Sequence, residues 1–114
     1  MSTAMKRYTF QSDGRNWIAP DALEKAQAGY TGVAADRLAS LENWIDALTA
    51  EQAQLAASLA ELRAEGRTKT TRFNQLLARK LTVGQMLSAM RAFGVLSPAD
   101  DAQVLQQDLQ PDQD

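Results

Sequence analysis

The chain has 114 residues, a net charge of −2, 45% hydrophobic residues and 23% charged residues. This composition is that of a folded chain, one domain or one domain with an extended arm, and it excludes wholesale disorder. The chain contains no cysteine and no histidine, which excludes disulfides, thiolate metal sites and the usual general base near neutral pH.

The first predicted element is a β-hairpin over residues 6–19. Asp13-Gly14 is a favoured two-residue turn, because both residues tolerate the positive φ of a type I′ turn. If Ser12 pairs with Arg15, three aromatic side chains share one face of the hairpin: Tyr8, Phe10 and Trp17. An isolated hairpin is only marginally stable in water, so we expect it to dock on a helix or on another chain.

A short helix is predicted after the hairpin, over residues 20–29. Pro20 suits the first helical position, Asp21 suits the positive end of the helix dipole, and Gly29 provides a C-cap. The hairpin and this helix make up a predicted N-terminal segment, residues 1–32.

A long helix is predicted from about Val33 to Glu65, where no Pro or Gly occurs and strong helix formers dominate. At about 1.5 Å per residue it would be roughly 50 Å long. Its apolar residues recur in alternating steps of three and four, the heptad pattern of coiled coils, with one polar exception. We name this stripe the seam: Leu38, Leu41, Ile45, Leu48, Gln52, Leu55, Leu59 and Leu62.

Shorter helices are predicted to fold back after Gly66. One covers about residues 69–81, and a capping box formed by Thr82 and Gln85 begins another, which ends at Gly94.

Residues 33–96 are therefore predicted to form the long helix plus a helical hairpin. Residues 97–114 are predicted as a short acidic helix, begun by Ser97-Pro98-Ala99-Asp100, and a frayed end. The expected fold class is mainly α, with a small N-terminal β-hairpin, one long coiled-coil-like helix and two or three shorter helices folding back.

The seam predicts self-association as a homo-dimer or higher oligomer, with Gln52 setting register or oligomer state. Alternatively, the same stripe packs against the later helices of its own chain. We favour self-association, because later helices broken at Leu81–Thr82 would match the long helix poorly. Trp44 flanks the seam, either as an interface anchor or packed against the aromatic face of the hairpin. The predicted oligomer interface consists of Leu38, Leu41, Trp44, Ile45, Leu48, Gln52, Leu55, Leu59 and Leu62.

Charge is unevenly distributed along the chain. No acidic residue occurs between Gly66 and Ala99, whereas the chain after Ser97 carries only negative charge. Six basic residues are candidates for contacts with phosphates or with an acidic partner: Arg67, Lys69, Arg72, Arg79, Lys80 and Arg91. The favoured alternative is that the acidic long helix neutralises them within the protein. The net charge of −2 lacks the basic footprint of a nucleic-acid binder.

The sequence contains no pattern that predicts catalysis. It has no glycine-rich phosphate loop and no Gly-x-Ser-x-Gly elbow, so we expect no enzyme, catalytic residue, cofactor, metal or small-molecule substrate. No stretch of 18 apolar residues occurs, and no apolar run follows Lys6 and Arg7. We therefore expect no signal peptide and a cytoplasmic protein without membrane contact.

The predicted function is that of a non-enzymatic protein-interaction or oligomerisation protein, which binds itself and another protein. Such a protein would be an adaptor, an assembly factor or an inhibitor of another protein, of a kind that suits a phage or mobile element. The alternative is a nucleic-acid-binding dimer that presents the basic segment 67–91, with Gln85 and Ser88 facing the groove of the duplex.

Overall fold

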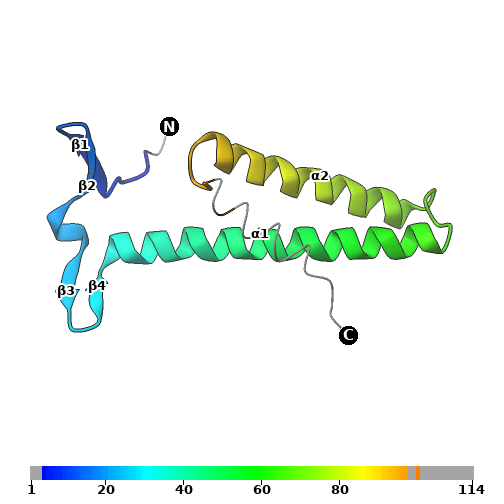
Figure 1. Cartoon of the computed structure of the whole chain (residues 1–114), viewed down its shortest axis with the longest axis horizontal. Coiled ribbons are helices and arrows are strands. Elements are labelled where there is room, and N and C mark those ends of the chain that lie inside the picture. Colours follow the sequence, from blue (N-terminus) through cyan, green and yellow to red (C-terminus); the bar gives the residue numbers. More distant parts are fainter. Residues whose placement is uncertain (1–3, 98–99, 101–114) are drawn as a thin grey trace. The chain divides into compact units, whose positions relative to one another are not determined.

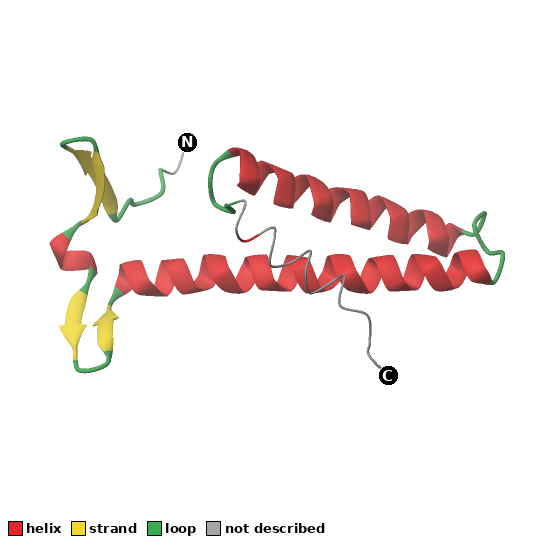
Figure 2. Ribbon diagram, in the orientation of Figure 1, coloured by secondary structure: helices red, strands yellow, loops and turns green. Residues whose placement is uncertain are grey.

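The structure is a computed structural model that describes residues 4–97 and residue 100 (Figure 1). The chain divides into an N-terminal unit, residues 1–46, and a C-terminal unit, residues 47–114, with the boundary inside the long helix. The elements in chain order are β1 (Thr9–Ser12), β2 (Arg15–Ile18), the 3₁₀ turn η1 (Pro20–Ala22), β3 (Glu24–Ala26), β4 (Gly29–Thr31), α1 (Val33–Ala64) and α2 (Thr71–Ala92). The fold is mainly helical, with two long helices and small two-stranded sheets near the N-terminus (Figure 2).

The hairpin β1–β2 confirms the predicted turn and register. Asp13 and Gly14 both have positive φ, 54° and 71°, as a type I′ turn requires. Phe10 pairs with Trp17, and the Tyr8 carbonyl accepts a hydrogen bond from the next residue after β2, at 2.8 Å. Because side chains alternate between the faces of a strand, Tyr8, Phe10 and Trp17 share one face, which we name the aromatic face.

The predicted helix over residues 20–29 is wrong. Helix stops after the single turn η1, and Leu23 is already extended at φ −136° and ψ 151°. A second hairpin, β3–β4, follows and pairs Ala26 with Gly29. The second hairpin brings the chain back to η1, so that a Cβ on Gly32 would lie only 2.6 Å from the carbonyl oxygen of Ala22. A helix over these residues would carry position 32 about 15 Å away from Ala22, so this contact excludes it despite good helix formers.

The helix α1 confirms the predicted long helix, with 32 residues from Val33 to Ala64. It ends as predicted around Gly66, where the chain makes the two backbone bonds of a Schellman motif. The Arg67 amide donates to the Leu62 carbonyl at 2.8 Å, and the Gly66 amide donates to the Arg63 carbonyl at 3.0 Å.

The helix α2 corrects the prediction of two short helices. It is one helix of 22 residues, capped at its start by the Thr70 hydroxyl, which accepts from the Phe73 amide at 3.1 Å. The predicted capping box at Thr82 does not form, because the Thr82 hydroxyl donates to the Ala78 carbonyl one turn earlier, at 3.1 Å. A threonine within a helix satisfies its hydroxyl in this way without ending the helix.

The end of α2 agrees with the prediction at Gly94, since the Val95 amide bonds back to the Met90 carbonyl at 2.8 Å. The predicted acidic helix and frayed end, residues 97–114, lie outside the described residues except for Ser97 and Asp100. These two exchange hydrogen bonds in the pattern of a capping box: the Ser97 amide donates to Asp100 Oδ2 at 2.9 Å, and the Asp100 amide donates to Ser97 Oγ at 3.3 Å.

The core of the C-terminal unit lies where α2 runs back along the C-terminal part of α1 (Figure 1). Leu59 is completely buried, in a cluster with Leu62 and Phe73. The guanidinium of Arg63 lies 5.4 Å from the centre of the Phe73 ring and covers it. In this part of the seam, the later helix of the same chain therefore provides the packing partner.

The N-terminal unit has almost no core of its own. Among its described residues only Ala22 is buried. Eight of its large apolar side chains are between 43% and 67% exposed: Met5, Phe10, Trp17, Ile18, Tyr30, Val33, Leu38 and Trp44. The two units therefore differ sharply in how much apolar surface they bury.

Candidate partner-binding surface

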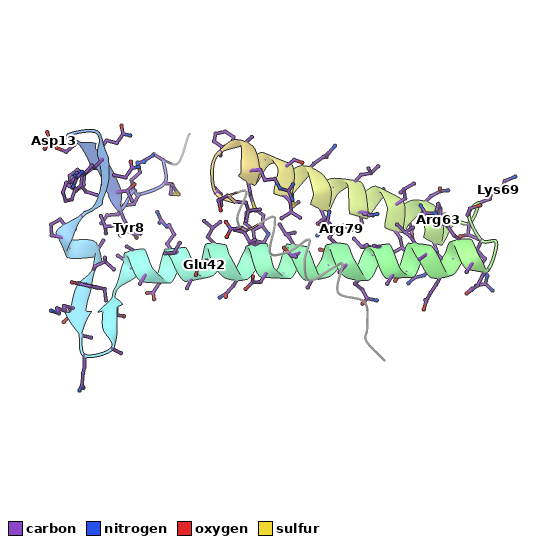
Figure 3. The ribbon with its side chains drawn as sticks, viewed as in Figure 1. Tyr8, Asp13, Glu42, Arg63, Lys69 and Arg79 are labelled. Carbon is purple, nitrogen blue, oxygen red and sulfur yellow. The ribbon has the colours of Figure 1, made fainter. Side chains whose placement is uncertain are left out.

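Arg37 connects the first hairpin to α1. Its guanidinium carbon lies 4.2 Å from the centre of the Tyr8 ring, and its Nη1 donates a hydrogen bond to the Lys6 carbonyl at 2.5 Å. The ammonium of Lys6 lies 5.8 Å from the centre of the same ring. Figure 3 shows Tyr8 on the side of the hairpin next to α1. The two contacts of Arg37 hold Tyr8 beside the first turns of α1.

The rest of the aromatic face stays open. Phe10 and Trp17 lie opposite each other in the ladder, and both are about half exposed. The Trp17 indole donates from Nε1 to the Ser12 carbonyl at 3.0 Å. This bond orients the indole and satisfies its polar atom, so the remaining ring surface is available for apolar contact.

The stripe of α1 that contains Arg37 continues with apolar residues. Leu41, Trp44 and Ile45 follow Arg37 at steps of four, seven and eight, which places them on one side of the helix. Leu41 and Ile45 are half-buried, and Trp44 is about half exposed. Arg37, one turn before Leu41, contacts Tyr8 of the aromatic face. We name the aromatic face and this stripe together the aromatic corner, which consists of Tyr8, Phe10, Trp17, Leu41, Trp44 and Ile45.

The structure divides the predicted oligomer interface between the two units. Of the seam residues in the N-terminal unit, Leu38 is exposed, and Leu41 and Ile45 are half-buried. In the C-terminal unit four seam leucines are buried: Leu48, Leu55, Leu59 and Leu62. Trp44 is about half exposed, and its role as an interface anchor or as a packing partner of the hairpin stays a prediction.

The basic residues of segment 67–91 do not form one free surface. Arg79 donates two hydrogen bonds to Glu51, from Nε at 2.5 Å and from Nη2 at 2.8 Å. These bonds lower the pKa of Glu51 and raise the pKa of Arg79. Arg67 lies 3.6 Å from the Glu65 carboxylate, and Arg91 occupies the last turn of α2, where a cation suits the helix dipole.

Lys69 and Arg72 are exposed and form no ion pair with any residue that the structure describes. Arg79 is therefore neutralised within the protein by Glu51, as the favoured alternative expects. Lys69 and Arg72 remain as candidates for contacts with an outside partner.

A shallow groove of about 520 Å³ lies on the C-terminal unit. Its lining is Gln52 of α1 together with Leu77, Lys80, Leu81, Gly84, Gln85 and Ser88 of α2. Sequence reasoning missed this groove, although Gly84 within a helix was a signal. Gln85 and Ser88, which we considered as base-contacting residues, line it.

Two further observations bear on the chemistry of the chain. Among the residues that the structure describes, no three acidic side chains lie close enough together to hold a metal ion. No helix in this part of the chain is both long and apolar enough to cross a membrane.

No protein family, characterised protein sequence or solved structure shows significant similarity to the chain.

Proposed function

We propose that this protein is a non-enzymatic interaction protein that associates with itself through its N-terminal unit. The observation that carries the proposal is the contrast between one buried side chain, Ala22, and the exposed apolar side chains of the same described part of the chain. Two-stranded hairpins are marginal in water unless they pack against something. The unit therefore gains stability by covering this surface with a partner.

The exposed apolar surface is large enough to support a specific interface. Four aromatic side chains are exposed: Phe10, Trp17 and Trp44 are about half exposed, and Tyr30 is 65% exposed. Together they leave about 400 Å² open, since each buries about 200 Å² when covered completely. A standard interface buries about 800 Å² per partner, and the aliphatic side chains of the unit supply much of the remainder.

The aromatic corner has the composition of an interaction hot spot. Trp, Tyr and Arg are the residue types that most often dominate binding energy. Arg37 contacts Tyr8, and Trp17 lies on the same hairpin face as Tyr8. The contacts of Arg37 and the indole bond of Trp17 order this surface before a partner arrives. Such order reduces the entropy lost on binding.

A second copy of the chain is the partner that we expect at the aromatic corner. The first three seam residues, Leu38, Leu41 and Ile45, lie in the N-terminal unit, and a heptad pattern of this kind packs against a matching helix. In the C-terminal unit the corresponding leucines already pack against α2. Self-association therefore uses the first turns of α1, and a further protein bound by the oligomer would make the chain an adaptor, assembly factor or inhibitor.

Sedimentation equilibrium over a wide range of concentration tests this proposal. The variant Phe10→Ser with Trp17→Ser removes apolar surface from the aromatic corner. The matched control, Leu81→Ser with Phe93→Ser, removes two exposed apolar side chains from the C-terminal unit. We expect the parent and the control to associate and the corner variant to stay monomeric. A monomeric parent at every concentration, or equal association of both variants, would overturn the proposal.

A further inference from the structure

We propose that the groove on the C-terminal unit holds the acidic segment of the same chain, residues 101–114. This proposal concerns a different surface from the aromatic corner and does not depend on self-association. It rests on the lining of the groove, on complementary charge and on the reach of the chain after α2.

The groove is suited to apolar side chains beside a cation. Leu77 and Leu81 form its apolar wall, and Leu81 is 62% exposed. Gly84 leaves the middle of the groove open, because a Cβ there would have only Gln52 Nε2 near it, at 3.9 Å. Lys80 lines the same groove and adds a positive charge.

Charge favours an acidic occupant. Residues 71–92 contain basic residues and no acidic ones. Arg79 is already paired with Glu51, whereas Lys80 and Arg72 form no ion pair with any described residue. The segment 101–114 carries four aspartates and no basic residue, and it also supplies three apolar side chains: Val104, Leu105 and Leu109.

The chain after α2 can reach the groove. The backbone turns at Gly94, where the Val95 and Leu96 amides both bond to the Met90 carbonyl, at 2.8 and 3.3 Å. Ser97 and Asp100 then exchange the hydrogen bonds of a helix start. The path from Ala92 back to Leu81 is about 17 Å along the helix, and the fourteen residues of the segment span about 21 Å even as a helix.

In this position the acidic segment 101–114 would cover the basic side of α2. A nucleic acid or an acidic protein that binds α2 would first have to displace the segment. The segment would then act as an internal competitor, and its effect would weaken as salt screens the charges.

Paramagnetic broadening in the full chain tests the proposal. The chain has no cysteine, so Gln107→Cys can be labelled at one site with a nitroxide. We expect the amide signals of Leu81, Gly84 and Ser88 to lose intensity at low salt and to recover at high salt. Labelled chain carrying Leu105→Ser and Leu109→Ser should show no such loss, and neither should labelled chain carrying Lys80→Glu and Leu81→Ser, which changes the groove itself.

Mixing separates binding within one chain from binding between chains. Nitroxide-labelled chain without ¹⁵N is added to ¹⁵N chain without a label. We expect no broadening in this mixture, because the segment binds within its own molecule. Broadening in the mixture equal to that of the single chain would overturn the proposal in favour of exchange between copies. Undiminished groove signals in the labelled single chain at low salt would overturn it completely.

Discussion

Arg79 of α2 donates two nearly parallel hydrogen bonds to the carboxylate of Glu51 on α1, at 2.5 and 2.8 Å. This two-point geometry is the strongest form of an arginine–carboxylate pair. It joins residues that are 28 positions apart in the chain and sets the two helices in register. Because Arg79 is paired in this way, it is not available to bind an outside phosphate.

The pair makes stability depend on pH. Arg79 lowers the pKa of Glu51 in the folded chain, so the pair stabilises the fold above the ordinary glutamate pKa of about 4.3. This contribution is lost as pH falls through the lower folded pKa. In urea unfolding, Glu51→Gln should be less stable than the parent at pH 7, and the difference should vanish at acid pH. Glu61→Gln, an exposed change on the same helix, should show no such convergence.

The core between the helices should respond strongly to truncation at Leu59. Leu59 is completely buried beside Leu62 and Phe73, and Leu→Ala at such a site costs about 2–5 kcal/mol of the free energy of unfolding. Phe93→Ala, at an exposed position just after α2, should cost less than about 0.5 kcal/mol. Denaturant unfolding measures both, and equal effects would argue against α2 packing on this side of α1.

The continuity of α2 predicts opposite signs for two threonine substitutions. Thr70→Ala removes the N-cap bond to the Phe73 amide and should cost about 1 kcal/mol. Thr82→Ala replaces a residue within the helix by a better helix former and should be neutral or stabilising by up to about 0.6 kcal/mol. A loss of stability in Thr82→Ala as large as that in Thr70→Ala would instead indicate a helix start at Thr82.

The N-terminal unit should depend on the absence of a side chain at Gly32. In Gly32→Ala the new Cβ would meet the Ala22 carbonyl oxygen at 2.6 Å, so the chain could not return beside η1. We expect the amide signals of β3 and β4 to shift and their hydrogen exchange to accelerate. Gly29→Ala carries a comparable backbone strain, because both glycines have positive φ, 151° at Gly29 and 129° at Gly32. It has nothing within 4 Å of its Cβ and should change these signals less, so an equal or larger change there would argue against the close return.

Nucleic-acid binding should be weak, because Arg79 is paired within the protein and the groove cation Lys80 faces the proposed acidic segment. In fluorescence anisotropy with duplex DNA or single-stranded RNA at physiological salt, we expect little binding. The variant Arg72→Glu with Arg79→Glu should lose stability rather than affinity, because Glu51 loses its partner. Tight binding by the parent that this variant abolishes would favour the nucleic-acid alternative.

Sequence determined the parts of this protein that depend on neighbouring residues. Asp13-Gly14 sets the register that places Phe10 opposite Trp17, because only certain residues accept the φ values of a two-residue turn. The run without Pro or Gly predicts nearly the full extent of α1, and Gly66 marks its end. These features arise from local sterics and backbone hydrogen bonds, which a short window of sequence contains.

Tertiary structure decided the features that join distant residues. Residues 20–31 form a second hairpin instead of a helix because Gly32 returns to Ala22. The same spacing of leucines is compatible with a coiled coil between chains and with a pair of helices within one chain. The structure decides for the C-terminal unit, because α2 folds back and buries Leu59 against Phe73. The pairing of Arg79 with Glu51 follows from this path of α2. Periodicity specifies which side of a helix is apolar, whereas the partner depends on where the chain brings another apolar surface.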